Sequence, residues 1–145
     1  MTRNSAAQTS PTNEYEAVAQ FRSTLRRFQH VSDEVARRHG LTARRYELLV
    51  MIAGAPTDRP ASTSDVAKRM YVELHTATEL VARAEQAGLV RRTTDTQDRR
   101  ISRLALTEDG RRRLDATIEA LRPERERLTE LLADIHRQAA ALAES

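Results

Sequence analysis

Apolar residues recur at intervals of three and four near both ends of the chain, which is the spacing of one face of an α-helix. The N-terminal stripe consists of Val18, Phe21, Leu25, Phe28, Val31 and Val35. The C-terminal stripe consists of Leu128, Leu131, Leu132, Ile135, Ala139 and Leu142. Gly40 ends the first predicted helix, and Pro123 starts or kinks the last one. Each stripe needs an apolar partner, which is either the other stripe or a second copy of the chain.

The segment between these helices predicts a third helix and a linker. Thr42 has the residue type and position of a helix cap. The inner face of the helix that follows is predicted to carry Tyr46, Leu49, Val50 and Ala53. Residues 55–61 contain two prolines, so we expect this linker not to be helical.

Two short helices joined by a tight turn are predicted between Ser62 and Gly88. Ser62 and Asp65 have the spacing of a capping box, which marks the start of the first of them. The buried face of the second is predicted to consist of Leu74, Ala77, Leu80, Val81 and Ala84. Its other faces carry Glu73, His75, Thr76, Thr78, Glu79 and Arg83. This arrangement is a helix-turn-helix, and Gly88 is placed to end it in the left-handed conformation.

Residues 91–106 predict a β-hairpin with a polar tip at 94–98, because Leu104 and Leu106 alternate with other residues in the return strand. Thr107 is predicted to cap the next helix, with acidic residues in its first turn. A helix-turn-helix followed by such a hairpin is a winged helix. The expected fold class is therefore mainly α (α+β), with a two-stranded β wing.

The length of the chain is that of one domain, and its arginine content suits a polyanionic partner. The chain has 145 residues and a formal net charge of +3, with only 3% aromatic residues, so completing its core with a second copy is favourable. Lys68 is the only lysine, which indicates a general preference for arginine. The arginines nevertheless gather around the predicted wing, at Arg91, Arg92, Arg99, Arg100, Arg103 and 111–113. The chain has no cysteine, which excludes disulfides and thiolate metal sites.

The wing sequence and its surroundings resemble the MarR (multiple antibiotic resistance regulator) family of winged-helix transcription factors. The resemblance rests on Ala87-Gly88-Leu89-Val90-Arg91-Arg92, then Asp98-Arg99-Arg100, then Leu104-x-Leu106-Thr107-x-x-Gly110. It implies a homodimer with a recognition helix in the major groove and a wing arginine in the minor groove. We expect a disordered tail at 1–12 and a single domain at 13–145, with dimerisation helices at 13–40 and 111–145 and the DNA-binding lobe at 41–110.

Groove chemistry gives each candidate residue an expected role on double-stranded DNA. We expect base edges and nearby phosphates to be contacted by His75, Thr76, Thr78 and Glu79. We expect Arg83 to contact a phosphate further along the DNA. Arg99 and Arg100 are both candidates for a narrow minor groove. The resemblance implies that Asp98 and Arg100 are the family's Asp-x-Arg pair, but it does not settle which of the two arginines reaches the groove. Asp98 is expected to support the wing by holding an arginine or a backbone amide, unless it only forms the turn. Two copies would bind a pseudo-palindromic operator.

The expected function is a sequence-specific DNA-binding transcriptional regulator, and the resemblance implies a repressor released by a small aromatic or anionic effector. The alternative is a winged-helix module that binds a protein without specific DNA binding; Glu73 and Glu79 favour it, and the wing arginines favour DNA. An enzyme is not expected, because the four histidines are scattered and no phosphate loop or nucleophile elbow is present. No cofactor, metal or ligand-binding residue is assigned. Without a signal peptide or membrane-spanning stretch, the expected location is cytoplasmic.

Overall fold

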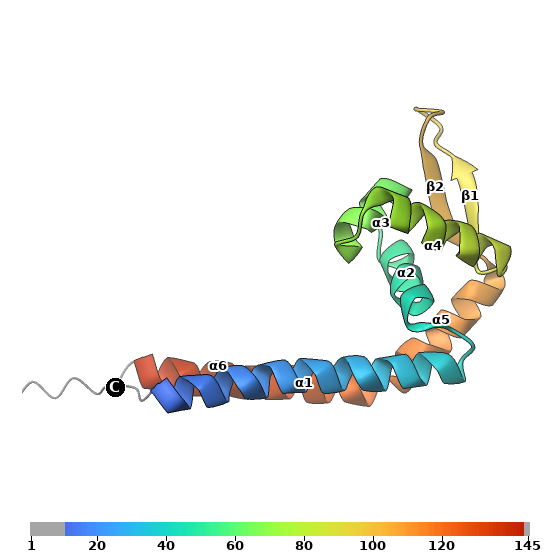
Figure 1. The fold of residues 1–145 in the computed structure, drawn as a ribbon. Helices are drawn as coiled ribbons and strands as arrows, with labels where there is room; N and C mark the ends of the chain where they lie inside the picture. Colours follow the sequence, from blue (N-terminus) through green and yellow to red (C-terminus); the bar gives the residue numbers. More distant parts are fainter. Residues whose placement is uncertain (1–10, 144–145) are drawn as a thin grey trace, which may run out of the picture. The chain divides into compact units, whose positions relative to one another are not determined.

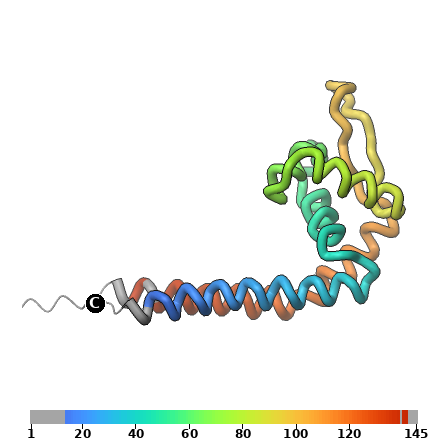
Figure 2. Tube along the Cα trace, in the orientation of Figure 1, coloured from blue at the N-terminus to red at the C-terminus, as the bar shows by residue number. Residues whose placement is uncertain are grey.

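The computed structural model describes residues 11–143, which divide into two compact units. The first, called the two-helix unit here, contains described residues up to Val31 and from Leu121 onward; the second, the winged unit, comprises Ser32–Ala120. Figures 1 and 2 trace the chain through both. The expected tail at 1–12 falls mostly outside the described residues, and the first helix already begins at Pro11. No helix within 11–143 is long and apolar enough to cross a membrane.

Two long helices make up the two-helix unit, α1 (Pro11–Arg38, whose last turns belong to the winged unit) and α6 (Arg122–Ala143). They lie side by side in opposite directions (Figure 1), and Arg27 Nη2 approaches Glu124 Oε1 to 3.9 Å. The N-terminal stripe is incompletely covered: Val18 is 53% exposed, and Phe21 and Leu25 are also exposed. Within this single chain, α6 therefore leaves part of the apolar face of α1 in contact with water.

The winged unit consists of helices around a small antiparallel hairpin. In chain order its elements after α1 are α2 (Ala43–Ala53), α3 (Thr63–Met70), α4 (Leu74–Gln86), β1 (Val90–Thr94), β2 (Ser102–Leu106) and α5 (Glu108–Ala120). The hairpin register pairs Val90 with Leu106 and Arg92 with Leu104. Its apolar residues extend a core that includes Leu41, Leu48, Leu49, Val66, Val81, Val90, Leu104 and Leu114. The expected fold class, mainly helical with a two-stranded wing, is confirmed.

Local signals set most helix ends where the sequence predicts them. The Thr42 side chain accepts a hydrogen bond from the Arg45 amide at 3.2 Å at the start of α2. Gly40 and Gly88 follow the ends of α1 and α4 with φ of 77° and 75°, a region that glycine enters without steric cost. The residues between α2 and α3 form turns and bends, as the two prolines require.

The buried face of α2 differs from the prediction. Leu48, Leu49 and Ile52 are buried, whereas Ala53 is exposed at the last turn. Tyr46 and Val50 are only partly buried against the core. The helix contacts α3, α4, α5 and β2, so its contact surface is wider than one stripe at intervals of three and four. Which side of such a helix is deepest depends on partners that are distant in sequence.

The run from Leu104 to Gly110 has a structural reason for its spacing. The Thr107 hydroxyl donates to the Gly88 carbonyl at 2.6 Å and accepts from the Gly110 amide at 3.0 Å, so it both caps α5 and ties it to the end of α4. A Cβ atom at Gly110 would lie 2.1 Å from the Leu89 carbonyl oxygen. Only glycine permits the first turn of α5 to approach the base of the hairpin this closely.

Candidate nucleic-acid interface

The helix-turn-helix is built from α3, a short turn and α4. Ser62 and Asp65 form a complete capping box: the Asp65 carboxylate accepts from the Ser62 amide at 3.0 Å, and the Ser62 hydroxyl accepts from the Asp65 amide at 3.1 Å. The turn passes through Tyr71, which ends α3 in the left-handed conformation with φ 55° and ψ 42°. The Val72 amide then donates to the Ala67 carbonyl at 3.1 Å, which fixes the direction in which α4 departs.

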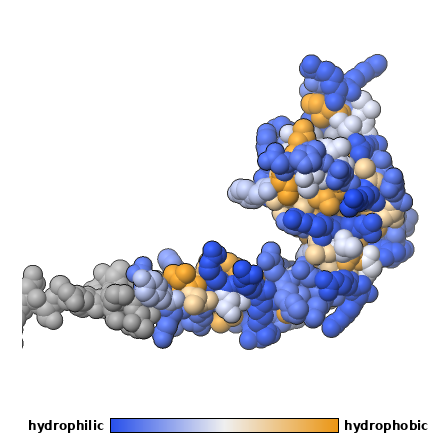
Figure 3. All heavy atoms as spheres, viewed as in Figure 1, coloured by the Kyte–Doolittle hydropathy of each residue, from blue (hydrophilic) through white to orange (hydrophobic). Residues whose placement is uncertain are grey.

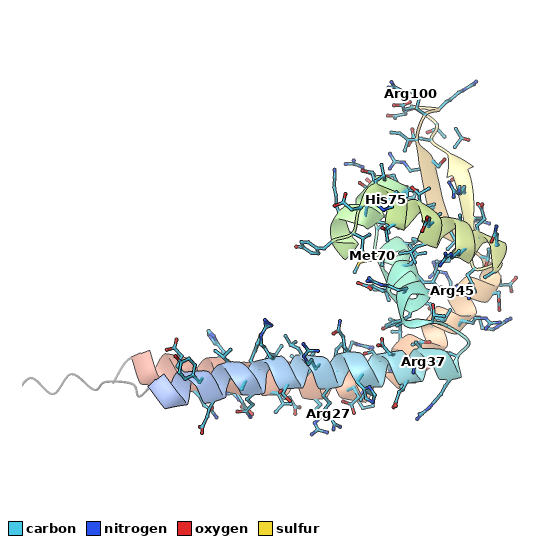
Figure 4. All side chains as sticks on the ribbon, in the orientation of Figure 1. Arg27, Arg37, Arg45, Met70, His75 and Arg100 are labelled. Atoms are coloured by element: carbon cyan, nitrogen blue, oxygen red, sulfur yellow. The ribbon has the colours of Figure 1, made fainter. Side chains whose placement is uncertain are left out.

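One face of α4 packs into the winged unit, and another is open to solvent. Ala77, Val81 and Ala84 are buried. Of the side chains assigned to DNA by sequence, His75, Thr78, Glu79 and Arg83 are exposed, and Thr76 is half-buried. Figure 4 shows His75 at the start of the helix. The Thr78 hydroxyl donates to the Leu74 carbonyl at 2.8 Å, so its hydrogen is already engaged within the helix.

The prediction that Leu74 lies on the buried face is wrong. Its side chain is 56% exposed, although its spacing to Ala77 and Val81 matches the buried stripe. Leu74 is the first residue of α4, directly after the turn, so the burial that covers later residues of the stripe does not extend to it. Periodicity identifies a helix face, but it does not show where along the helix the burial stops.

The hairpin tip is organised by Asp95. Its Oδ1 atom accepts from the amides of Gln97 and Asp98, each at 2.8 Å, which closes a tight turn of the kind aspartate favours. Its Oδ2 atom accepts from Arg103 Nε at 2.8 Å across the hairpin. The same carboxylate therefore shapes the tip and fastens it to β2.

Asp98 binds the side chain of Arg100, not that of Arg99. Arg100 Nε donates to Asp98 Oδ1 and Arg100 Nη2 donates to Asp98 Oδ2, both at 3.1 Å, while the Arg100 amide donates to Asp98 Oδ1 at 3.0 Å. The Arg100 side chain is nonetheless 90% exposed. Figure 4 shows it at the tip of the hairpin. The guanidinium is thus oriented by a two-pronged contact and remains open to a partner.

Arg103 was grouped by sequence with the arginines suited to phosphate, but it occupies a structural position. Its side chain is only 14% exposed and bonds to Asp95, while Nη1 donates to the Pro60 carbonyl at 3.0 Å and lies 3.7 Å from Asp65 Oδ2. It therefore connects the hairpin to the linker and to the start of α3. The cross-strand contact with Asp95 could have been found from the hairpin register, whereas the contacts with Pro60 and Asp65 have no local signal.

Several other arginines also have acidic neighbours within the winged unit. Arg92 Nε lies 3.3 Å from Glu85 Oε2. Arg112 and Arg113 both contact Asp109, and Arg113 Nη1 donates to the Gly40 carbonyl at the end of α1. The sequence cluster of arginines around the wing is therefore divided between groups that stabilise the fold and groups that are open to solvent.

The carboxylates of the wing are held in their charged form. Hydrogen bonds from the Arg103 side chain and from the Asp98 and Gln97 amides lower the pKa of Asp95 to about 2. The Arg100 side chain lowers the pKa of Asp98, and the same contact raises the pKa of Arg100. The Ser62 amide lowers the pKa of Asp65. These shifts show that the wing and the α3 cap are stabilised by ionised groups at neutral pH.

Acid should remove the contribution of Asp95 to stability. Because its pKa is about 2 in the folded protein and 3.8 ordinarily, the contribution is fully present above about pH 4 and is lost as pH falls through about 2. We expect the difference in unfolding free energy between the wild type and Asp95→Asn to be constant above pH 4 and to shrink toward pH 2 in denaturant titrations. Asp58→Asn, at an exposed linker position, is the control. A difference that does not change over this pH range would contradict the role of Asp95.

A basic hollow of about 430 Å³ lies between the start of α3 and the wing. Its lining includes four arginines, one carboxylate and several hydroxyls: Arg59, Arg92, Arg100 and Arg103, Asp65, and Ser62, Thr63, Ser64 and Ser102. Guanidinium and hydroxyl groups are the side chains that most often contact DNA phosphates. The hollow therefore joins the helix-turn-helix and the wing into one surface suited to a sugar-phosphate backbone.

Comparisons with known proteins agree with this geometry. Residues 39–101, which span the helix-turn-helix and the wing up to Ile101, match the model of the MarR family. A search of curated proteins gave no significant match. The resemblance inferred from the wing motif is confirmed.

Solved structures extend the similarity beyond this segment. AbsC, a MarR family transcriptional regulator from Streptomyces coelicolor, is 26% identical, with 92% of this chain and 96% of AbsC covered and a TM-score of 0.66. CouR from Rhodococcus jostii RHA1, bound to p-coumaroyl-CoA, is also 26% identical, with 80% and 83% covered and a TM-score of 0.63. The Staphylococcus aureus MepR–DNA complex shares the fold at 20% identity, with 88% and 93% covered and a TM-score of 0.68. The family consists of regulators, which agrees with the expectation of a non-enzymatic protein.

Proposed function

We propose that this chain, whose residues 39–101 match the model of the MarR family, is a homodimeric regulator that binds double-stranded DNA sequence-specifically and acts as a repressor released by a small molecule. The observation that carries the proposal is the pairing, within one compact unit, of an exposed polar helix with an arginine oriented at the wing tip. The first suits base edges in the major groove, and the second suits a neighbouring minor groove. A DNA-bound regulator of this kind acts where the DNA is, in the cytoplasm.

The recognition helix is α4, and its open face carries the base and phosphate contacts. His75 and Glu79 are exposed one helical turn apart, and Arg83 is exposed one turn further on. Glu79 can accept a hydrogen bond from a cytosine amino group but repels phosphate. Thr76 and Thr78 contribute less than the sequence suggested, because Thr76 is half-buried and the Thr78 hydroxyl hydrogen is engaged.

Arg100 is the arginine we assign to the minor groove. The sequence left open which of Arg99 and Arg100 reaches the groove, although the resemblance implied an Asp98–Arg100 pair. The two-pronged contact of Arg100 with Asp98 supports the choice of Arg100. A guanidinium already oriented before binding loses less conformational freedom when DNA arrives. Arg99, at the same tip, then serves as a phosphate contact, and Asp98 is the residue that supports the wing.

Dimerisation through α1 and α6 is supported by the apolar surface that one copy leaves uncovered. The exposed stripe from Val18 to Leu25 on α1 is accompanied on α6 by Leu128, Leu131, Leu132 and Ile135, which are only half-buried. Figure 3 shows hydrophobic residues at the surface along this pair of helices. Covering them with a second copy removes apolar surface from water, and it supplies the second winged unit that a palindromic operator requires.

Release by a small molecule is the part of the proposal that draws on CouR. That protein is bound to p-coumaroyl-CoA, an aromatic and anionic compound, and its sequence is 26% identical to this chain over the compared region. For such a compound to release DNA, it must bind better to a dimer geometry that does not fit the two half-sites. We propose an aromatic or anionic effector on this basis.

The second candidate is a winged helix that binds another protein. Glu73 and Glu79 give the recognition helix an acidic character that would repel phosphate, and this observation favours it. The basic hollow beside α3 and the exposed Arg100 favour DNA. The two candidates predict opposite results in one binding experiment.

Fluorescence anisotropy of the full chain provides that experiment. A labelled duplex from upstream of its own gene is titrated with protein at two salt concentrations, beside a scrambled duplex of equal length. We expect saturable binding to the first duplex that is stronger than to the scrambled one and weakens as salt rises, because phosphate contacts release counterions. Weak binding that is equal on both duplexes, and on duplexes enriched by selection from a random pool, would overturn the proposal.

A further inference from the structure

The recognition helix begins with an apolar side chain that is largely exposed. Leu74 is 56% exposed, and Tyr71, in the turn before it, is 94% exposed. Among the described residues, the other large apolar side chains with comparable exposure are Tyr15, Val18, Phe21 and Leu25, all in α1. Figure 3 shows hydrophobic residues reaching the surface of the winged unit among polar ones. A leucine exposed at this position is available to a partner outside the chain.

The residues next to Leu74 reinforce its apolar character. Thr78 lies one turn further along the same side of α4, and its hydroxyl donates to the Leu74 carbonyl at 2.8 Å. That hydrogen is therefore unavailable to a base. Glu73 precedes the helix without capping it through its side chain. The start of α4 thus offers DNA an aliphatic group beside the polar His75.

We infer that Leu74 is a specificity-determining residue that contacts the 5-methyl group of a thymine in the major groove. Thymine is the base whose major-groove edge carries an apolar group, and an aliphatic side chain is its complement. In helix-turn-helix proteins the N-terminal residues of the recognition helix are those that approach base edges. The inference rests on the proposed function and names one feature of the operator: a thymine at the same position in each half-site.

DNA suits this leucine better than a protein partner does. Within the winged unit only Tyr71 and Leu74 are exposed large apolar side chains, among residues 32–120 as described, which is a small area for a protein interface. Leu74 is also continuous with the exposed face of α4 through His75 and Thr78. An isolated methyl group in a polar groove matches an isolated leucine on a polar helix.

Replacing thymine with deoxyuridine tests this contact without changing any hydrogen bond. An operator is first obtained by selection from random duplexes with the full chain. Each thymine is then exchanged in both half-sites, which removes only its methyl group. We expect one position at which the exchange weakens binding about fourfold per half-site, or about fifteenfold for both, from the free energy of burying one methyl group. Leu74→Ala should weaken binding to the unmodified operator and abolish the difference between thymine and deoxyuridine there.

Controls separate this contact from general damage to the helix. Leu74→Gln keeps helix propensity but replaces the aliphatic group with a polar one, so it should also lose the thymine preference. Gln86→Ala, at an exposed position near the end of α4, should keep it. The inference is overturned if the wild type binds every deoxyuridine-substituted operator as tightly as the unmodified operator. It is also overturned if Leu74→Ala still prefers thymine to deoxyuridine. In both cases the proposed function stands. If selection yields no preferred duplex at all, the proposed function fails, and this inference fails with it.

Discussion

Replacing Arg99 and Arg100 together with alanine should weaken operator binding by about a hundredfold and leave the fold intact. Each exposed arginine contributes a contact of roughly 0.7 kcal/mol, and a dimer loses four such contacts, about 2.8 kcal/mol in all, which is a factor of about one hundred. The slope of log affinity against log salt should fall by about 0.9 for every phosphate contact removed. Anisotropy at several salt concentrations measures both quantities. Both side chains are exposed, so the loss of the Arg100–Asp98 contact should lower the thermal unfolding temperature only slightly.

Variants with a single substitution at the wing separate the effect of losing an arginine charge from the effect of losing the orientation of Arg100. Arg100 is oriented by Asp98 through bonds of 3.1 Å, so Arg100→Ala should cost more affinity than Arg99→Ala. Asp98→Ala keeps every arginine but removes this orientation. We expect it to lower affinity while leaving the salt slope near that of the wild type, because the number of phosphate contacts need not change.

Arg37→Ala is the matched control for these variants. Arg37 is an exposed arginine of the same winged unit, and Figure 4 shows it at the opposite end of that unit from Arg100. Its loss changes the net charge by the same amount as either single variant at the wing. If the wing variants and Arg37→Ala have equal effects, the wing acts only through net charge, and the assignment of Arg100 to the minor groove is wrong.

Replacing Leu131 and Ile135 together with glutamate should convert the dimer to a monomer and reduce operator affinity by about a hundredfold to ten-thousandfold. Both residues are half-buried on α6 within one chain. In the proposed dimer they become buried, and an unpaired carboxylate there is strongly unfavourable. The loss in affinity follows because two linked winged units bind two half-sites with an avidity of that order.

Mass measured by light scattering during gel filtration reports the oligomeric state, and circular dichroism reports whether the helices persist. His136→Glu is the control for position, since it places one such carboxylate at an exposed position of the same helix. A doubly substituted protein that remains a folded dimer and still binds its operator would refute dimerisation through α6. Retained helix with monomeric mass would support it directly.

Local chemistry in the sequence was enough to predict most of the winged unit. The capping box of Ser62 and Asp65, the cap at Thr107 and the left-handed Gly88 each involve residues a few positions apart. The hairpin at 90–106 follows from alternation and a polar tip. Such signals are readable because the atoms that interact are close in sequence, so the residue types alone constrain the geometry.

The candidate site was predicted less completely, because its details depend on which residues meet across the fold. The sequence placed Asp98 beside one of two arginines, and the bond to Arg100 is a matter of side-chain direction at the tip. Arg103 could not be separated from its exposed neighbours without Pro60, which lies far from it in the chain. Leu74 matched the buried stripe by spacing alone.

The sequence by itself determined the kind of protein: the order of the helices, the wing, and the set of residues from which a DNA-binding surface is made. Only the tertiary structure decided how that set is divided. It paired Arg103 with Asp95 across the hairpin, held Arg100 at the tip, and left Leu74 open at the start of α4. The physical reason is that charge and hydrophobicity belong to each residue alone, whereas burial and pairing belong to the neighbours that folding brings together.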